Sequence, residues 1–185
     1  ALPLFFPPLG FSDIRRTIVD VLNEQGGCFA RVPAQTAALF QRDTRVRVVA
    51  DPDNSDYVYR VEDLVRLVGK KYDGKRNLIR QFTGAHPFVY RRISAQDLTE
   101  LAAFEEEWCA VKACAQVLGL THEREAIHEM IRYFSSWQLI AGRIESEGKT
   151  RAIALAEPLR ADTMVMHVLK ADPSLPGAYQ VMLNR

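Results

Sequence analysis

The amino-acid sequence predicts an α/β fold of the α+β type, in which helices flank a mixed and mainly antiparallel sheet. Three observations predict it. Apolar residues recur at spacings of three and four along several stretches before residue 139, which is typical of amphipathic helices. After residue 139 the period changes to two around a turn at Gly148, which is typical of antiparallel strands. A chain of 185 residues that is 48% hydrophobic is large enough to bury a core, as one large domain or one and a half small ones.

The N-terminal elements are expected to be short. Prolines confine residues 4–9 to an edge strand, and an apolar stripe predicts a helix from Ile14 to Leu22 that ends at Gly26. Strands are expected at residues 28–32 and 46–50, with a short helix between them at residues 33–40.

The stretch from Tyr57 to Phe82 carries the most information. A helical pattern over residues 61–68 ends at Gly69, and a second pattern begins after Asn77. Residues 60–92 contain nine Lys or Arg against three Asp or Glu, whereas residues 94–129 contain two against eight. The net charge of +1 therefore hides a segregation of charge along the chain.

The cations between these two helical patterns form a basic cluster, which we define as Lys70, Lys71, Lys75 and Arg76. One interpretation is a solvated turn between two helices. The other is an anion site, because Gly69 and Gly74 allow close approach to the backbone and the next helix is expected to begin near Lys75.

The remaining elements follow in order. A strand is expected at residues 88–93, and Ser94 then caps a long helix that ends at Gly119. On that helix Glu105, Glu106 and Glu107 are interpreted as a solvated face. A second helix follows from Thr121, and then strands at residues 139–145, 151–156 and 163–169, with the middle strand paired to both others, and a final helix from residue 178.

Several classes of protein and site are not indicated. The three cysteines, Cys28, Cys109 and Cys114, are interpreted as buried thiols of a cytoplasmic protein, since the last two do not share a helix face. His122 and His128 have the wrong spacing for paired metal ligands, so no metal site is expected. No run of about eighteen apolar residues predicts a transmembrane segment, and the proline-rich start does not resemble a signal peptide. Nothing in the pattern indicates an oligomeric state.

The best candidates for chemistry lie between Glu157 and Gln180. Glu157, His167, Lys170 and Asp172 fall at the ends of two neighbouring strands, and we expect at least three of them to share a cleft beside Gly177. Strict alternation puts His167 and Lys170 on opposite faces, so a bulge or the strand end must redirect one of them. The alternatives are a hydrogen-bonded core histidine and a surface pair of Lys170 with Asp172.

Two blocks of sequence resemble the phosphatidylglycerol lysyltransferase C-terminal domain family. They read DYVYRVEDLVRLVGKKYDGKRNLI and AEPLRADTMVMHVLKADPSLPGAYQ, and they occur in the family's order. The positions that match the family's motifs are Gly69, Lys70, Lys71, Tyr72, Lys75, Arg76, Asn77, Glu157, Asp162, Thr163, His167, Lys170, Ala171, Asp172, Gly177 and Tyr179.

The resemblance implies a GNAT-like acyltransferase fold built from two tandem halves. On this basis residues 1–93 form one half, which includes the basic cluster, and residues 94–185 form a second half that we expect to be incomplete, since the family continues further. The expected fold also agrees with the order of strands and helices read from the sequence alone.

The resemblance further implies transfer of an aminoacyl or acyl group from an activated ester to an amine or hydroxyl acceptor. Such a step needs a proton acceptor and donors to the developing oxyanion. His167 or Glu157 is the candidate base, with Lys170, Asp172 and the loop amides near Gly177 beside it. The candidate substrate-binding residues are Lys70, Lys71, Lys75, Arg76, Asn77, Gly177 and Tyr179.

No tightly bound cofactor is expected. Aminoacyl-tRNA or acyl-CoA is the implied donor, tRNA the implied partner, and a small molecule or a lipid the acceptor. Two alternatives stay open, a non-catalytic RNA- or nucleotide-binding module and an acyl-CoA-dependent N-acetyltransferase.

Overall fold

The computed structural model describes residues 3–10 and 13–185 of the chain, which divides into two compact units, residues 1–58 and 59–185. The boundary between the units precedes the division expected at residues 93 and 94. Residues 59–93 belong to the second unit, because their strand pairs with a later strand and their longest helix packs against the last helix. The assignment of two GNAT-like halves stays a prediction.

The first unit contains a small parallel sheet. Strand β1 (Leu4–Phe5) pairs with β2 (Cys28–Phe29), and the helices are α1 (Ile14–Gln25) and α2 (Ala34–Ala38), followed by a 3₁₀ turn at Pro52–Asn54. Asp13 caps α1 by accepting a hydrogen bond from the amide of Arg16 at 2.9 Å. The strand expected at residues 46–50 is wrong, because these residues pair with no strand in the described part of the chain and Val48 and Val49 are exposed.

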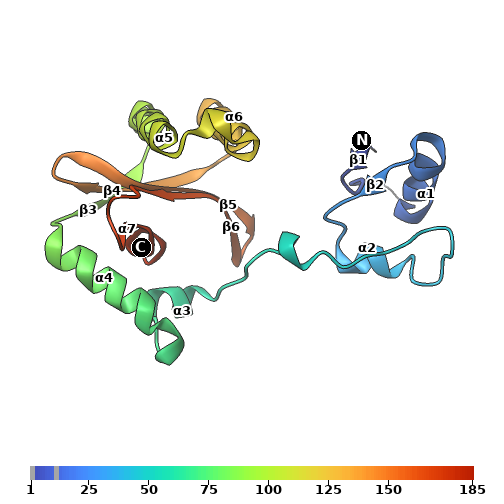
Figure 1. The fold of residues 1–185 in the computed structure, drawn as a ribbon, viewed down its shortest axis with the longest axis horizontal. Coiled ribbons are helices and arrows are strands. Elements are labelled where there is room, and N and C mark those ends of the chain that lie inside the picture. The colour runs from blue at the N-terminus through green and yellow to red at the C-terminus, as the bar shows by residue number, and fades with distance from the viewer. Residues whose placement is uncertain (1–2, 11–12) are drawn as a thin grey trace. The chain divides into compact units, whose positions relative to one another are not determined.

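The second unit is built on a four-stranded antiparallel sheet (Figure 1). Its strands lie in chain order and are β3 (Val89–Ile93), β4 (Ile140–Ser146), β5 (Lys149–Arg160) and β6 (Thr163–Ala171). Strand β5 pairs with both β4 and β6, which confirms the predicted meander around Gly148. The α+β class with a mainly antiparallel sheet is also confirmed, and the one parallel pairing in the described chain is that of β1 with β2.

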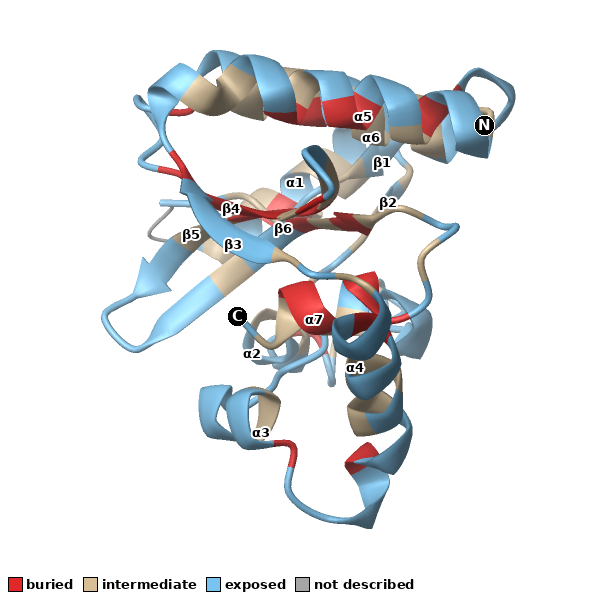
Figure 2. Cartoon of the chain, turned by 90° about the vertical axis from the view of Figure 1, so that its left-hand side faces the viewer, coloured by how far each residue is buried: buried red, intermediate tan, exposed pale blue. Residues whose placement is uncertain are grey.

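Helices cover both faces of this sheet (Figures 1 and 2). The bounds are α3 (Val61–Arg66), α4 (Asp73–Ala85), α5 (Leu98–Lys112), α6 (Leu118–Arg132) and α7 (Ala178–Leu183), with a 3₁₀ turn at Lys70–Tyr72 before α4. Strand β5 shows the expected alternation: Ile153 and Leu155 pack in the core under α5 and α6, whereas Ala152 and Ala154 pack toward α4 and α7. Residues 57–59 have the strand-forming composition Tyr-Val-Tyr but lie outside any strand.

The long helix that begins after Ser94 ends earlier than expected. Ser94 and Asp97 form the predicted capping box, but Ala113 adopts a left-handed conformation (φ 52°) and ends α5, while Gly119 lies inside α6. Cys114 therefore lies beyond the helix, with its Cα 5.0 Å from that of Cys109, and the two cysteines form a disulfide. The interpretation of all three cysteines as buried thiols is wrong, since Cys28 is an exposed thiol.

Strand β6 carries a bulge at His167. Leu155 pairs with Val168 and the next residue of β5, Ala156, pairs with Met166, so His167 is the extra residue. The bulge turns the imidazole toward α6, the same side of the sheet on which Val168 and Lys170 are buried. The bulge therefore places His167 and Lys170 on the same side of the sheet, which strict alternation would have prevented.

Candidate functional site

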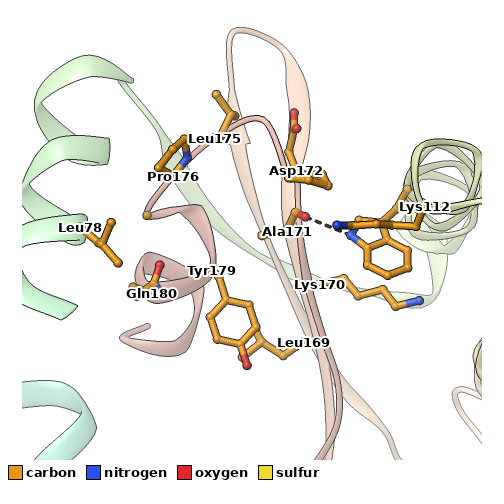
Figure 3. Close-up of a pocket in the computed structure, with 13 residues that line it drawn as sticks. Leu78, Lys112, Leu169, Lys170, Ala171, Asp172, Leu175, Pro176, Tyr179 and Gln180 are labelled. Atoms are coloured by element: carbon orange, nitrogen blue, oxygen red, sulfur yellow. Dashed lines mark hydrogen bonds between the residues drawn. The ribbon is translucent and has the colours of Figure 1, made fainter. Parts of the chain in front are cut away.

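One cavity of about 460 Å³ lies at the open edge of the sheet, where β6 ends (Figure 3). We call it the Gly177 cavity. Its walls come from the end of β6, the loop that follows, α7, and single faces of α4 and α5. Four of the predicted residues line it, Lys170, Asp172, Gly177 and Tyr179, together with residues that the sequence did not single out, notably Trp108, Lys112 and Gln180.

Gly177 lies where the start of α7 packs closely against α4. Its φ is +95°, and a Cβ there would lie 2.3 Å from the carbonyl oxygen of Leu78 on α4. Only glycine fits this backbone conformation and this close approach. Glycine at position 177 is therefore required by the close packing against α4. That packing places Leu78 and Tyr179 in the lining of the same cavity.

Lys170 does not offer its ammonium group to the cavity. Its Nζ lies 2.7 Å from Oε1 of Glu105 and 3.0 Å from Oε2 of Glu123, and it is 4.0 Å from the ring centroid of Trp108. The indole Nε1 of Trp108 in turn donates to the carbonyl of Ala171 at 3.1 Å. Lys170 thus anchors α5 and α6 to β6, and its predicted part as an oxyanion donor has no support in this geometry.

Glu105 corrects the interpretation of the three glutamates as one solvated face. Its side chain is fully buried, and burial raises its pKa although Lys170 acts in the opposite direction. Glu106 and Glu107 are exposed, and Glu106 pairs with Arg124 and His128 on α6. The helix face rotates by 100° per residue, so one member of the run points at the sheet.

Asp172 shapes the loop that bounds the Gly177 cavity. Its carboxylate accepts hydrogen bonds from the amide and hydroxyl of Ser174, at 2.9 and 2.6 Å, and from Arg151 at 3.1 Å. Partial burial acts to raise the pKa of Asp172, but the hydrogen bonds from Ser174 and the contact with Arg151 outweigh it and lower the pKa. The suggested surface pair of Asp172 with Lys170 is not formed.

His167 and Glu157 lie elsewhere, at a second cavity of about 330 Å³ that we call the His167 cavity. Nε2 of His167 is 2.8 Å from Oε1 of Glu157, and both side chains are partly exposed. The cavity is completed by α6 and the segment leading into β4. The expectation that three of the four candidates share one cleft is wrong. Two of them line the Gly177 cavity and the other two line the His167 cavity.

The basic cluster lies on and before the first turns of α4. Lys70 and Lys71 are exposed, Lys75 is half-buried, and Lys71 lies 3.7 Å from Asp63. Arg76 is engaged with the carbonyls of Leu67 and Gly69 and with Asp73, so it closes the turn before α4. The helix begins at Asp73 rather than near Lys75, which places a carboxylate at its N-terminus. The three lysines remain as candidate anion contacts.

Comparison with known proteins identifies the family. Residues 2–185 match the family model described as phosphatidylglycerol lysyltransferase, C-terminal. The chain belongs to this family. A comparison with curated proteins finds no match. A solved structure, described as a conserved protein of unknown function from Bacteroides thetaiotaomicron VPI-5482, is similar over 98% of this chain with a TM-score of 0.83 and 29% identity. The chain spans 64% of the length of that protein.

Within the described part of this family member, no helix is long and apolar enough to cross a membrane. In residues 3–10 and 13–185, no three His, Cys, Asp or Glu side chains gather as a metal site would require.

Sequence reasoning missed the contributions of α5 and α6 to the two cavities. Trp108 and Lys112 of α5 line the Gly177 cavity, and Glu129 of α6 lines the His167 cavity together with Trp137, which follows that helix. One signal was available: Trp108 and Lys112 are four residues apart and share a helix face. Which cavity that face borders depends on the packing of α5 across β6, which has no local sequence signature.

Proposed function

We propose that this family member transfers an aminoacyl or acyl group from an activated ester, such as aminoacyl-tRNA, to an amine or hydroxyl acceptor. The observation that carries the proposal is the pair of His167 and Glu157, 2.8 Å apart at the edge of a cavity. A carboxylate on one ring nitrogen orients an imidazole and stabilises its protonated form. Family membership supports this class of reaction.

His167 is the proton acceptor in this proposal. Nε2 is engaged by Glu157, and Nδ1 has no hydrogen-bond partner among the described residues. Nδ1 takes the proton from the attacking amine or hydroxyl, while Glu157 acts as a positioning residue. The nucleophile forms a bond to the acyl carbon, the ester C–O bond breaks, and the leaving oxygen receives a proton.

The Gly177 cavity is the proposed donor site. Lys112 and Tyr179 line it as exposed polar groups, and Trp108 provides an aromatic wall. Leu78 belongs both to this cavity and to α4, one turn beyond Lys75. Lys70, Lys71 and Lys75 would then contact the phosphates of a tRNA whose 3′-terminal nucleotide enters the cavity and whose acyl group extends along β6 to His167.

The test is transfer of a radiolabelled amino acid from a mixture of charged tRNAs to a panel of amines and alcohols. We expect His167→Asn to lower kcat about 10²- to 10⁴-fold. Glu157→Gln should lower kcat with the KM for charged tRNA unchanged, which separates positioning of His167 from donor binding. His122→Asn, on an exposed histidine of α6, serves as the matched control. Full activity in His167→Asn, with the protein folded, would exclude this mechanism.

A second function is favoured by the basic cluster, in which Lys70 and Lys75 have no ion-pair partner within the described chain. These side chains would equally serve a non-catalytic RNA-binding module. Binding of uncharged tRNA without any transfer, from charged tRNA or from acyl-CoA as donor, would support the module over the enzyme.

A further inference from the structure

The walls of the His167 cavity combine an apolar lining with acidic groups. Met130, Leu139 and Trp137 form the apolar part, and Trp137 stacks on Tyr133 with ring centroids 5.3 Å apart. The ionisable groups that line the cavity are Glu129, Glu157 and His167. No lysine or arginine belongs to its lining.

The carboxylates keep acceptor capacity after their known contacts are counted. Oε1 of Glu129 is 3.0 Å from Arg132, and Oε1 of Glu157 is engaged by His167. The second oxygen of each carboxylate has no hydrogen-bond partner in residues 3–10 and 13–185. The two carboxylates give the lining two formal negative charges, of which Arg132 offsets one from outside.

We infer that the His167 cavity binds a primary alkylammonium, and that this ligand is the acceptor of the transfer reaction. Only the acceptor role rests on the proposed function, and ammonium binding does not depend on it. An ammonium group on an apolar stem matches each wall: the carboxylates accept its N–H groups, the indole face attracts its charge, and Met130 and Leu139 pack on the stem. A phosphate or carboxylate would instead face two like charges.

The acceptor chemistry balances with the groups present. The bound ammonium gives one proton to Nδ1 of His167 and becomes a nucleophilic amine. Its nitrogen bonds to the acyl carbon as the ester C–O bond breaks, and the product is an amide. The amine nitrogen loses its second proton, so that one proton ends on the released alcohol and one passes to solvent.

Binding is tested first without any donor. The chain has two tryptophans, so an NMR spectrum of the intact protein contains two indole N–H signals, which Trp137→Phe assigns. Titration with n-butylamine hydrochloride should shift the Trp137 signal in a saturable way. Neither n-butanol nor sodium pentanoate, which have the same butyl stem without the positive charge, should shift it at equal concentration.

Variants then test the named groups. Glu129→Gln should weaken butylamine binding about tenfold, because a charged hydrogen-bond partner is lost. Trp137→Leu should weaken it about two- to fivefold by calorimetry. Glu125→Gln is the matched control, an exposed glutamate of α6 outside the cavity, and should bind as the parent does. Equal shifts with butanol, or unchanged affinity in Glu129→Gln, would overturn the site.

The acceptor role is tested by incubating the protein with charged tRNAs and butylamine. Formation of the N-aminoacyl butylamide, reduced in Glu129→Gln, is the expected result. Saturable binding with transfer only to alcohols would overturn the acceptor role while the transferase stands. Binding without transfer to any acceptor would defeat the proposed function but not the ammonium site.

Discussion

Lys170 and Glu105 form an ion pair between β6 and α5, with Nζ 2.7 Å from Oε1 and side chains that are 4% and 0% exposed. Loss of one partner leaves a buried charge without compensation. We therefore expect Lys170→Met to lower the free energy of unfolding by about 3 to 5 kcal/mol, measured by urea denaturation at pH 7.

The double variant Glu105→Leu with Lys170→Met is the control for that prediction, because it removes both charges. It should recover most of the lost stability. A Lys170→Met variant as stable as the parent would show that the pair is not formed in solution.

Gly177 should be intolerant of any side chain. Gly177→Ala imposes a left-handed conformation on alanine and a contact with the carbonyl oxygen of Leu78, so the free energy of unfolding should fall by at least about 2 kcal/mol. Gly84→Ala, in an open position of α4, should be neutral or stabilise the protein by about 0.5 to 1 kcal/mol. Similar thermal shifts for the two variants would contradict this account of the α4 and α7 contact.

The lysines of the basic cluster should contribute to polyanion binding. The double variant Lys70→Gln with Lys75→Gln should bind tRNA more weakly and should lower the slope of log K against log salt by about 0.7 to 0.9 per lost phosphate contact. The exposed Lys149, the first residue of β5, provides a charge-removal control. Unchanged binding at both low and moderate salt would identify the cluster as a solvated turn.

Asp172 should make stability depend on pH. Its pKa is lowered in the folded protein, so its contribution is present above the unfolded value of about 3.9 and is lost as pH falls through the lower folded value. Asp172→Asn should therefore cost about 1 to 2 kcal/mol at pH 7, and less below about pH 4. Unfolding curves at pH 7, 5 and 3.5 measure the difference in the free energy of unfolding between the parent and the variant. A difference independent of pH would contradict the lowered pKa of Asp172.

Local patterns predicted much of the second unit. The meander around Gly148 and the capping box of Ser94 and Asp97 follow from rules that act over a few residues. For the redirection of His167 or Lys170 the same rules offered either a bulge or the strand end, and the structure has a bulge at His167. The same rules failed at residues 46–50, where strand character is present but no partner strand lies alongside in the described chain.

At least three of the four candidate residues were expected to share one cleft, and the structure does not bring three of them together. Glu157, His167, Lys170 and Asp172 all line cavities, yet two cavities divide them. The division arises because Lys170 is drawn under α5 by Glu105, whereas the bulge brings His167 against α6.

The sequence by itself determined the family, the α+β class, the strand meander and the residues most worth testing, because these depend on motifs, periodicity and turn chemistry within short stretches. Only the tertiary structure decided that Glu105 is a buried partner rather than a solvated residue, that Arg76 closes a turn, and that Trp137 shares a cavity with His167. Each of these depends on which helix face packs on which strand, and such contacts join residues far apart in the chain, where no local pattern records them.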